Sequence, residues 1–262
     1  MHPELIHIGG ITIYAYGFMI MIGALTAYAF GAKVFKAELG IEPEKVQTLT
    51  ILIISAAVIG GKLFFYLEDP QFYFGTPANL LKNFRQGFVF YGSFILIVPT
   101  LIWFFRTEKW PVWPMMDIIS ILAPIIHGFG RLGCFFAGCC YGLPTNSFLG
   151  VTFSADKSQA KPLDTPLHPT QLYEFFLLAG IFLILLQVKR VQKFKGQLFF
   201  LYVMLYAFGR SVIEVLRGDL RRGFIIDEVL SHSQFISIIL IVLAGIGYRW
   251  FSSRNQYKIK KS

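Results

Sequence analysis

Residues 115–135 read MMDIISILAPIIHGFGRLGCF, an apolar run that contains one acidic and two basic side chains. The length of this run falls within the roughly 17–25 residues that a transmembrane helix requires. A charged side chain near the bilayer centre costs about 2.5–3.5 kcal/mol on insertion scales, so it marks a functional site by default. The stretch therefore predicts a membrane-spanning helix that carries a polar site at His127 and Arg131. Asp117 lies near the other end of the same helix.

Six further apolar runs of similar length occur along the chain. They are continuously apolar rather than alternating, which is typical of helices and not of barrel strands. The seven windows are 11–32, 48–67, 88–105, 115–135, 172–188, 197–216 and 234–251. We therefore expect an all-α integral membrane protein with about seven transmembrane helices, forming a single transmembrane domain over residues 1–262.

The composition excludes several other classes of protein. Hydrophobic residues make up 55% of the chain and charged residues 15%, against roughly 25% charged residues in ordinary soluble domains. So few charges cannot cover a soluble core, and they exclude a disordered chain and a nucleic-acid-binding domain. The net charge of +9 is instead typical of contact with anionic membrane lipid.

The loops between the windows are unequally basic. With the N-terminus outside, the cytoplasmic segments hold 14 Lys and Arg residues and the outer segments hold 7. This bias favours an external N-terminus and a cytoplasmic C-terminus, because basic residues are retained on the inside. Residues 249–262 then form a basic cytoplasmic tail.

This topology places the polar side chains of six spans in the outer half of the membrane. Asp117 is the exception, at the inner end of its span. We therefore expect one polar cavity that opens toward the outer leaflet. Its predicted members are Tyr16, Lys62, Tyr91, His127, Arg131, His168, Glu174, Arg210 and Glu214.

The spacing of the charged residues predicts shared helix faces. His127 and Arg131 are separated by four residues, as are Arg210 and Glu214, and Arg217 lies about one turn further on. Two or three guanidinium groups in a cleft of low dielectric constant indicate an anionic ligand, and a phosphate fits their planar donors. The alternative is that Arg210 pairs with Glu214 only to lock two helices together.

Two other segments allow both a functional and a structural interpretation. His168 directly precedes Pro169 at the start of a span, where it is either a base at the mouth of the cavity or part of a simple helix entry. Cys134, Cys139 and Cys140 match no common zinc spacing. Packing is the favoured role of these cysteines, with a disulfide or a metal site as alternatives. We therefore expect neither a metal nor a cofactor.

Five motifs in order along nearly the whole chain resemble the prolipoprotein diacylglyceryl transferase family. The segment from His168 to Glu174 is similar to the family's His-Pro-Ser/Thr-Gln-Leu-Tyr-Glu, and the segment from Gly130 to Gly142 is similar to its glycine-rich signature. The other three motifs are Tyr14–Gly17, Gly60–Lys62 and the Gly-Arg-x-x-x-Glu-x-x-Arg segment at 209–217.

The resemblance implies a seven-span enzyme of the bacterial inner membrane. Such an enzyme transfers the diacylglyceryl group of phosphatidylglycerol to the lipobox cysteine thiol in the signal peptide of a preprolipoprotein. Glycerol phosphate leaves and a thioether forms. The nucleophile then belongs to the substrate, and Arg131 and Arg210 would hold the phosphate. The matching substrate-binding residues are Tyr16, Lys62, Gly142, Glu174, Glu214 and Arg217.

Two departures from the family pattern affect the chemistry. Tyr91 stands where the family has histidine, and Cys134 and Ala137 stand where it has asparagines. We therefore expect Tyr91 to orient the lipid and His168, before His127, to take the thiol proton. The alternatives are a related transferase with another acceptor, or a carrier or flippase for an anionic lipid that performs no chemistry.

Overall fold

The computed structural model describes residues 3–8, 11–82, 87, 89–218, 224–226 and 229–259. These residues fall into two compact units. The larger unit is Met1–Phe30 with Trp113–Ser262, and the smaller unit is Gly31–Val112. We describe each unit by itself. That residues 1–262 form one transmembrane domain stays a prediction.

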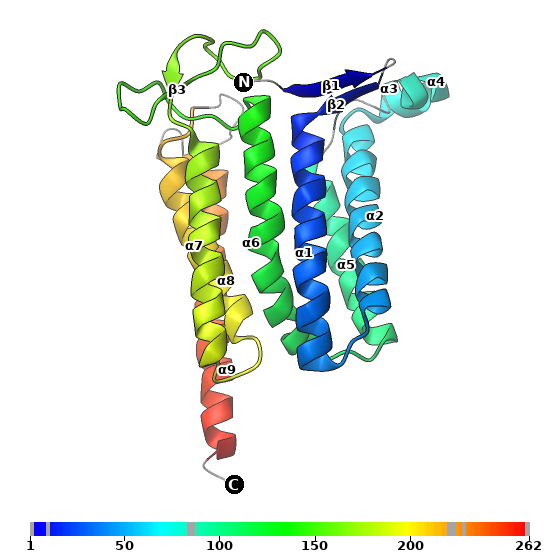
Figure 1. The fold of residues 1–262 in the computed structure, drawn as a ribbon, viewed down its shortest axis with the longest axis vertical. Helices are drawn as coiled ribbons and strands as arrows, with labels where there is room; N and C mark the ends of the chain where they lie inside the picture. The colour runs from blue at the N-terminus through cyan, green and yellow to red at the C-terminus, as the bar shows by residue number, and fades with distance from the viewer. Residues whose placement is uncertain are drawn as a thin grey trace. The chain divides into compact units, whose positions relative to one another are not determined.

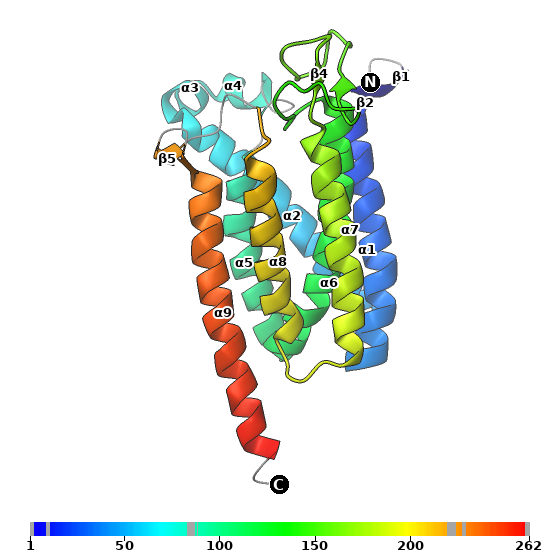
Figure 2. The same cartoon turned by 90° about the vertical axis from the view of Figure 1, so that its left-hand side faces the viewer.

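The larger unit is built from long helices with short two-stranded sheets at their ends. Figures 1 and 2 show α6, α7, α8 and α9 as long helices in this unit, with β1, β2 and the loop that carries β3 at the end where the N-terminus lies. Its helices are the first part of α1 (Ala15–Leu39), α6 (Val112–Ala137), α7 (Thr170–Arg190), α8 (Gln197–Glu214) and α9 (His232–Ile259). Its strands are β1 (Glu4–Ile8), β2 (Ile11–Tyr14), β3 (Val151–Thr152), β4 (Pro166–Leu167), β5 (Phe224–Ile226) and β6 (Leu230–Ser231), paired in chain order as antiparallel hairpins.

The smaller unit contains the remaining helices. Its long helices are α2 (Pro43–Glu68) and α5 (Phe90–Thr107), joined through the short helices α3 (Pro70–Gly75) and α4 (Pro77–Lys82). α2 and α5 approach closely where Gly60 faces Gly92, since a Cβ on either glycine would collide with the carbonyl oxygen of the other. Small residues at such crossings let membrane helices pack backbone against backbone.

Each of the seven predicted windows contains a helix. Among the described residues, five of these helices are long and apolar enough to cross a membrane by length and composition, namely α1, α2, α6, α7 and α9. The chain is therefore a mostly helical, multi-pass membrane protein, and the number of seven crossings stays a prediction. Many large apolar side chains on these helices are exposed, for example Phe176 and Leu243, as a lipid-facing surface requires.

The predicted boundaries need three corrections. The first window began at residue 11, but Ile11–Tyr14 forms β2 and the helix begins at Ala15, because β-branched residues favour a strand. The segment 68–87 was expected to be a loop, yet it contains α3 and α4, each with a proline at its first helical position. Helix α9 extends to Ile259, so the tail that begins at residue 249 is helical over most of its length.

Asp117 lies apart from the predicted cavity because it caps a helix. Its Oδ1 accepts hydrogen bonds from the backbone N–H groups of Leu198 at 2.9 Å and Phe199 at 3.2 Å. Its Oδ2 accepts from the Gly196 N–H and from Nε2 of Gln192, both at 2.6 Å. A carboxylate from α6 thus satisfies the N–H groups at the start of α8, which a helix cannot satisfy by itself.

We expect Asp117→Ala to lower the free energy of unfolding by about 2–4 kcal/mol, because it removes a helix cap and leaves buried N–H groups without acceptors. Thermal unfolding in detergent micelles would measure the loss. Ser120→Ala is the matched control, since the Ser120 hydroxyl is also buried on α6 but donates to Met116 O within that helix. Equal unfolding temperatures for Asp117→Ala and Ser120→Ala would contradict the capping role.

Candidate active site

A group of four side chains from three helices forms the polar centre of the larger unit. This arginine cluster consists of His127 and Arg131 on α6, Glu174 on α7 and Tyr206 on α8. Nη2 of Arg131 lies 3.0 Å from Oε1 of Glu174. The Tyr206 hydroxyl donates to the same oxygen at 2.8 Å, so three helices meet at one carboxylate.

His127 holds the arginine rather than serving as an available base. Nε of Arg131 donates to Nε2 of His127 at 3.2 Å. A guanidinium N–H can only donate, so Nε2 accepts and carries no proton in this arrangement. The 3.5 Å approach of Nε2 to Oε1 of Glu174 is then not a charged pair. His127 is therefore a positioning residue for Arg131.

The charged side chains of the arginine cluster are buried, so each one needs the other as a partner. The side chain of Glu174 is 3% exposed and that of Arg131 is 17% exposed. A charge in such surroundings needs a partner, because desolvation costs several kcal/mol per ion. The contacts above use Nε and Nη2 of Arg131, and a guanidinium carries five N–H donors. The cluster can therefore bind an anion without giving up its internal carboxylate.

A second buried ion pair follows one turn later on α8. Nη1 of Arg210 lies 2.5 Å from Oε2 of Glu214, with side chains that are 12% and 3% exposed. The four-residue spacing allowed this pair as the alternative to phosphate binding by Arg210. Arg210 also comes four residues after Tyr206, so both side chains project from one face of α8. The two arginines are thus presented by α6 and α8 in the same unit.

Gly142, His168 and Arg217 meet through their backbones at one end of the larger unit. The Gly142 N–H donates to the His168 carbonyl at 2.8 Å, and the His168 N–H donates to the Leu143 carbonyl at 3.0 Å. Gly142 also forms an antiparallel bridge with Arg217. A Cβ on Gly142 would lie 2.6 Å from the Leu216 oxygen, which explains why only glycine fits.

The side chain of His168 is half-buried next to the start of α7. Its Nδ1 lies 3.1 Å from the hydroxyl of Tyr173. This contact orients the imidazole ring through Nδ1. It does not involve the other ring nitrogen, Nε2. The role of His168 as a base stays a prediction, whereas Nε2 of His127 accepts a hydrogen bond from Arg131.

Tyr16 belongs to the same unit as the arginine cluster. It lies in the first turn of α1, where that helix passes α6 at Gly133. A Cβ on Gly133 would be 3.1 Å from the Cα of Tyr16. Gly133 comes two residues after Arg131, so Tyr16 contacts α6 within one helical turn of the predicted phosphate site.

Lys62 and Tyr91 belong to the smaller unit. Nζ of Lys62 donates to the carbonyl of Gly87 at 2.9 Å. Tyr91 lies in the first turn of α5, next to the glycine contact with α2, and its side chain is outside the described part of the structure. The roles of both residues toward the arginines stay predictions.

Sequence reasoning missed the fourth member of the arginine cluster. Tyr206 could have been found from its four-residue spacing to Arg210, which places it on the functional face of α8. The pairing of Arg131 with Glu174 had no signal of this kind. The two residues are 43 positions apart and only the packing of α6 against α7 brings them together.

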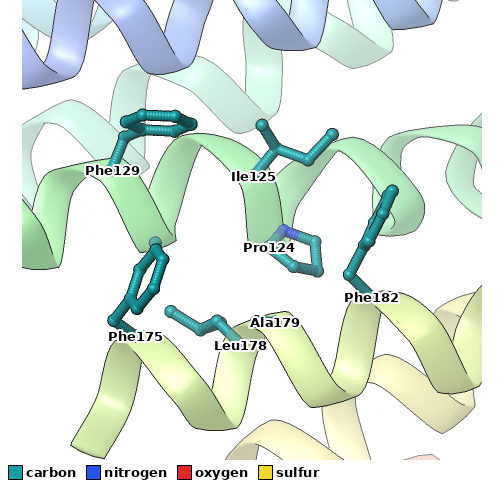
Figure 3. Close-up of a pocket in the computed structure, with 8 residues that line it drawn as sticks. Pro124, Ile125, Phe129, Phe175, Leu178, Ala179 and Phe182 are labelled. Atoms are coloured by element: carbon teal, nitrogen blue, oxygen red, sulfur yellow. The ribbon is translucent and has the colours of Figure 1, made fainter. Parts of the chain in front are cut away.

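An apolar groove lies between α6 and α7. Its volume is about 140 Å³. Figure 3 shows that Phe129 and Ile125 on α6 and Phe175 and Phe182 on α7 are among its lining residues. Gly128 and Phe175, which also line the groove, directly follow His127 and Glu174 in the sequence. The same pair of helices thus carries both an apolar groove and the charged side chains of Arg131 and Glu174.

The fold and the site define a multi-pass membrane protein with a buried, ionised cluster between its helices. Comparison with known proteins specifies its kind. The family model of prolipoprotein diacylglyceryl transferase matches residues 3–250, and the chain belongs to this family. It is therefore an enzyme of the transferase class, which confirms what the five motifs implied.

Individual relatives agree with the family model. A phosphatidylglycerol–prolipoprotein diacylglyceryl transferase of Clostridium tetani is 37% identical, over 93% of this chain and 95% of that protein. A second protein of that description, numbered 2, from Clostridium perfringens is 34% identical over 92% of each chain. A relative from Symbiobacterium thermophilum with the same description is 28% identical, over 96% of this chain and 93% of that protein.

Proposed function

We propose that this chain transfers the diacylglyceryl group of phosphatidylglycerol to the lipobox cysteine thiol of a preprolipoprotein, the first step of lipoprotein maturation. The acceptor sulfur bonds to the glyceryl carbon, the bond from that carbon to the phosphate oxygen breaks, and glycerol phosphate leaves. The observation that carries the proposal is the buried arginine cluster. It occurs in a chain whose relatives are named as phosphatidylglycerol–prolipoprotein diacylglyceryl transferases.

The arginines supply the charge that the leaving phosphate requires. Arg131 and Arg210 each retain a buried carboxylate partner, so they stay fixed and oriented before the lipid arrives. Donors fixed in a low-dielectric site stabilise developing negative charge with little reorganisation. The apolar groove between α6 and α7 suits part of an acyl chain of the same lipid, because its lining side chains are apolar.

A thioether assay tests the proposal directly. Purified full-length protein in phosphatidylglycerol vesicles would be given a lipobox peptide, and mass spectrometry would detect the added diacylglyceryl group. We expect product with the cysteine peptide and none with a peptide in which serine replaces that cysteine. If the protein binds lipid but forms no product with the cysteine peptide, that result would support a carrier. It would contradict a transferase that uses the lipobox cysteine as its acceptor.

We further propose that the chain lies in the bacterial inner membrane with seven crossings, an external N-terminus and a cavity toward the outer leaflet. The unequal Lys and Arg counts support this orientation. β1, β2 and the β3 loop also lie at one end of the larger unit, opposite the end of α9 (Figure 1).

The orientation makes a prediction about reporter fusions. A reporter after residue 254 should show cytoplasmic activity, because the flanking segment is strongly basic. A reporter inserted in the loop between α6 and α7, at Ser147, should be active on the outer side. A periplasmic signal from the C-terminal fusion would reverse the proposed orientation.

Tyr91→Phe should lower the transfer rate only moderately. Removing one hydroxyl removes one hydrogen bond to a phosphate or ester oxygen, a loss of about 1–2 kcal/mol or roughly 10-fold. Steady-state kinetics with the lipobox peptide would measure it. A loss above about 1,000-fold would mean that Tyr91 takes part in proton transfer, which contradicts a role limited to orienting the lipid.

A further inference from the structure

Three thiols converge at the end of α6, one turn beyond the arginine cluster. Cys134 is buried in the last turn of the helix, and Cys139 and Cys140 are half-buried just after it. Their Sγ atoms all lie within 4.8 Å of one another. All three thiols are free. The spacing in the sequence matches no common zinc pattern, so this convergence is a product of the fold.

The backbone turns sharply to bring the thiols together. Gly138 and Cys140 both adopt the left-handed conformation, with φ of 74° and 58°. The Cys139 N–H donates to the Cys134 carbonyl at 3.1 Å, which folds the chain back over the helix end. A non-glycine residue in this conformation costs of the order of 1–3 kcal/mol, and such residues cluster at functional sites.

Two buried side chains of α7 hold this turn in place. Oγ1 of Thr170 donates to the Cys140 carbonyl, and Nε2 of Gln171 donates to the Cys139 carbonyl, both at 2.6 Å. The side chains of Thr170 and Gln171 are each 1% exposed. The thiol cluster is therefore fixed from α6 and from α7 independently of any ligand.

Three converging sulfurs have a definite ligand chemistry. Zn²⁺ binds thiolate at about 2.3 Å, which places sulfurs in a tetrahedral site about 3.8 Å apart. The thiols here need to move by an ångström or less to reach that spacing. Within the described part of the chain, no histidine or carboxylate joins the three sulfurs as a fourth ligand. Three protein ligands with one open position are typical of catalytic zinc sites.

We propose that Cys134, Cys139 and Cys140 together bind one Zn²⁺ ion, and that its open position takes the thiol of the acceptor cysteine. The second half rests on the proposed function. The acceptor sulfur bonds to the metal as a thiolate, and its proton passes to His168, the base expected from the sequence. A thiol bound to zinc is deprotonated outright, and the thiolate is the nucleophile that thioether formation requires.

The position of the thiol cluster fits this role. Cys134 comes three residues after Arg131 on α6, so the two side chains lie on one helix face about 4.5 Å apart along the axis. The acceptor sulfur would thus be held one turn from the phosphate that is displaced.

Metal binding can be measured without any assay of transfer. Reduced, chelator-treated full-length protein would be titrated with Co²⁺ as a spectroscopic substitute for Zn²⁺. We expect one Co²⁺ per chain, with a thiolate-to-cobalt charge-transfer band that Zn²⁺ abolishes. The variant with Cys134→Ser, Cys139→Ser and Cys140→Ser should bind none. Ser158→Ala is the matched control and should bind normally, because Ser158 lies in another loop but packs against Gly138 of the turn.

A second variant covers the case in which the triple variant fails to fold. Cys140→Ser alone keeps two thiols and should weaken binding by more than the roughly 10-fold that loss of a supporting residue costs. Sub-stoichiometric Co²⁺ in reduced wild-type protein would overturn the site. Mass spectrometry that finds a native disulfide among the three cysteines would also overturn it.

The open position is tested by adding the lipobox peptide to the cobalt form. The cysteine peptide should change the cobalt spectrum and the serine peptide should not. If neither peptide changes the spectrum, the proposal that the open position binds the acceptor thiol is overturned. Full-rate transfer by metal-free protein overturns this inference and leaves the proposed function intact. Thiol binding at the cobalt without transfer by any metal form supports the site and counts against the proposed function.

Discussion

Arg131→Ala is expected to lower the rate of diacylglyceryl transfer by about 10²–10³-fold, the loss that removal of one fixed donor to a developing oxyanion causes. Arg131→Lys should also be poor, because an ammonium cannot replace the planar guanidinium that contacts both His127 and Glu174. Arg210→Ala should cause a loss of similar size. Kinetics with vesicles and the lipobox peptide would measure all three.

The buried partner of Arg131 requires a control. Arg131→Ala leaves Glu174 as a buried charge that has lost its cation, which by itself destabilises a protein by about 3–5 kcal/mol. Arg131→Ala combined with Glu174→Gln removes that charge and should restore stability. If the arginine binds phosphate, the double variant stays inactive although it is folded. Recovery of transfer in the double variant would show that Arg131 acts only through stability.

His168→Ala is expected to lower transfer by about 10²–10⁴-fold, as loss of a general base does. The backbone bonds of His168 to Gly142 and Leu143 do not involve its side chain, so the fold at this position should survive. Tyr173→Phe is the matched control, because it removes the hydroxyl next to Nδ1 but keeps the imidazole. Its effect should be at most about 10-fold.

The pH–rate profile separates a base from a structural residue. The wild-type profile should show an acid limb that is absent from the His168→Ala profile and present in that of Tyr173→Phe. An acid limb that persists without His168 would place the base elsewhere. Nε2 of His127 accepts from Arg131, so a base at His127 would require that contact to break first.

The long helices could be predicted from the sequence because a bilayer imposes one simple requirement on each. Some 20 consecutive apolar residues are needed whatever the rest of the chain does, and each window that meets this contains a helix. The same argument could not predict the strand at Ile11–Tyr14. Its residues are as apolar as those of a helix, and pairing with β1 decides its conformation.

The site could be predicted less completely because its contacts run between helices. Periodicity places Arg210 and Glu214 on one face, and in the structure the two side chains form an ion pair. No periodicity within one helix could join Arg131 to Glu174, or the Asp117 carboxylate to the start of α8. The convergence of the three thiols has the same origin, since it depends on two left-handed residues beyond the helix end.

The cap at Asp117 also makes the number of residues between the cap and the arginine cluster important on both α6 and α8. From that anchor, α6 extends to His127 and α8 extends to Tyr206, roughly 12–15 Å further on at 1.5 Å per residue. There the two rings contact each other with centroids 5.0 Å apart. Inserting one residue in α8 between Leu198 and Tyr206 would rotate everything beyond it by about 100° and withdraw the tyrosine from Glu174. The chain should therefore tolerate many exchanges of apolar side chains along this stretch, yet no change in its length.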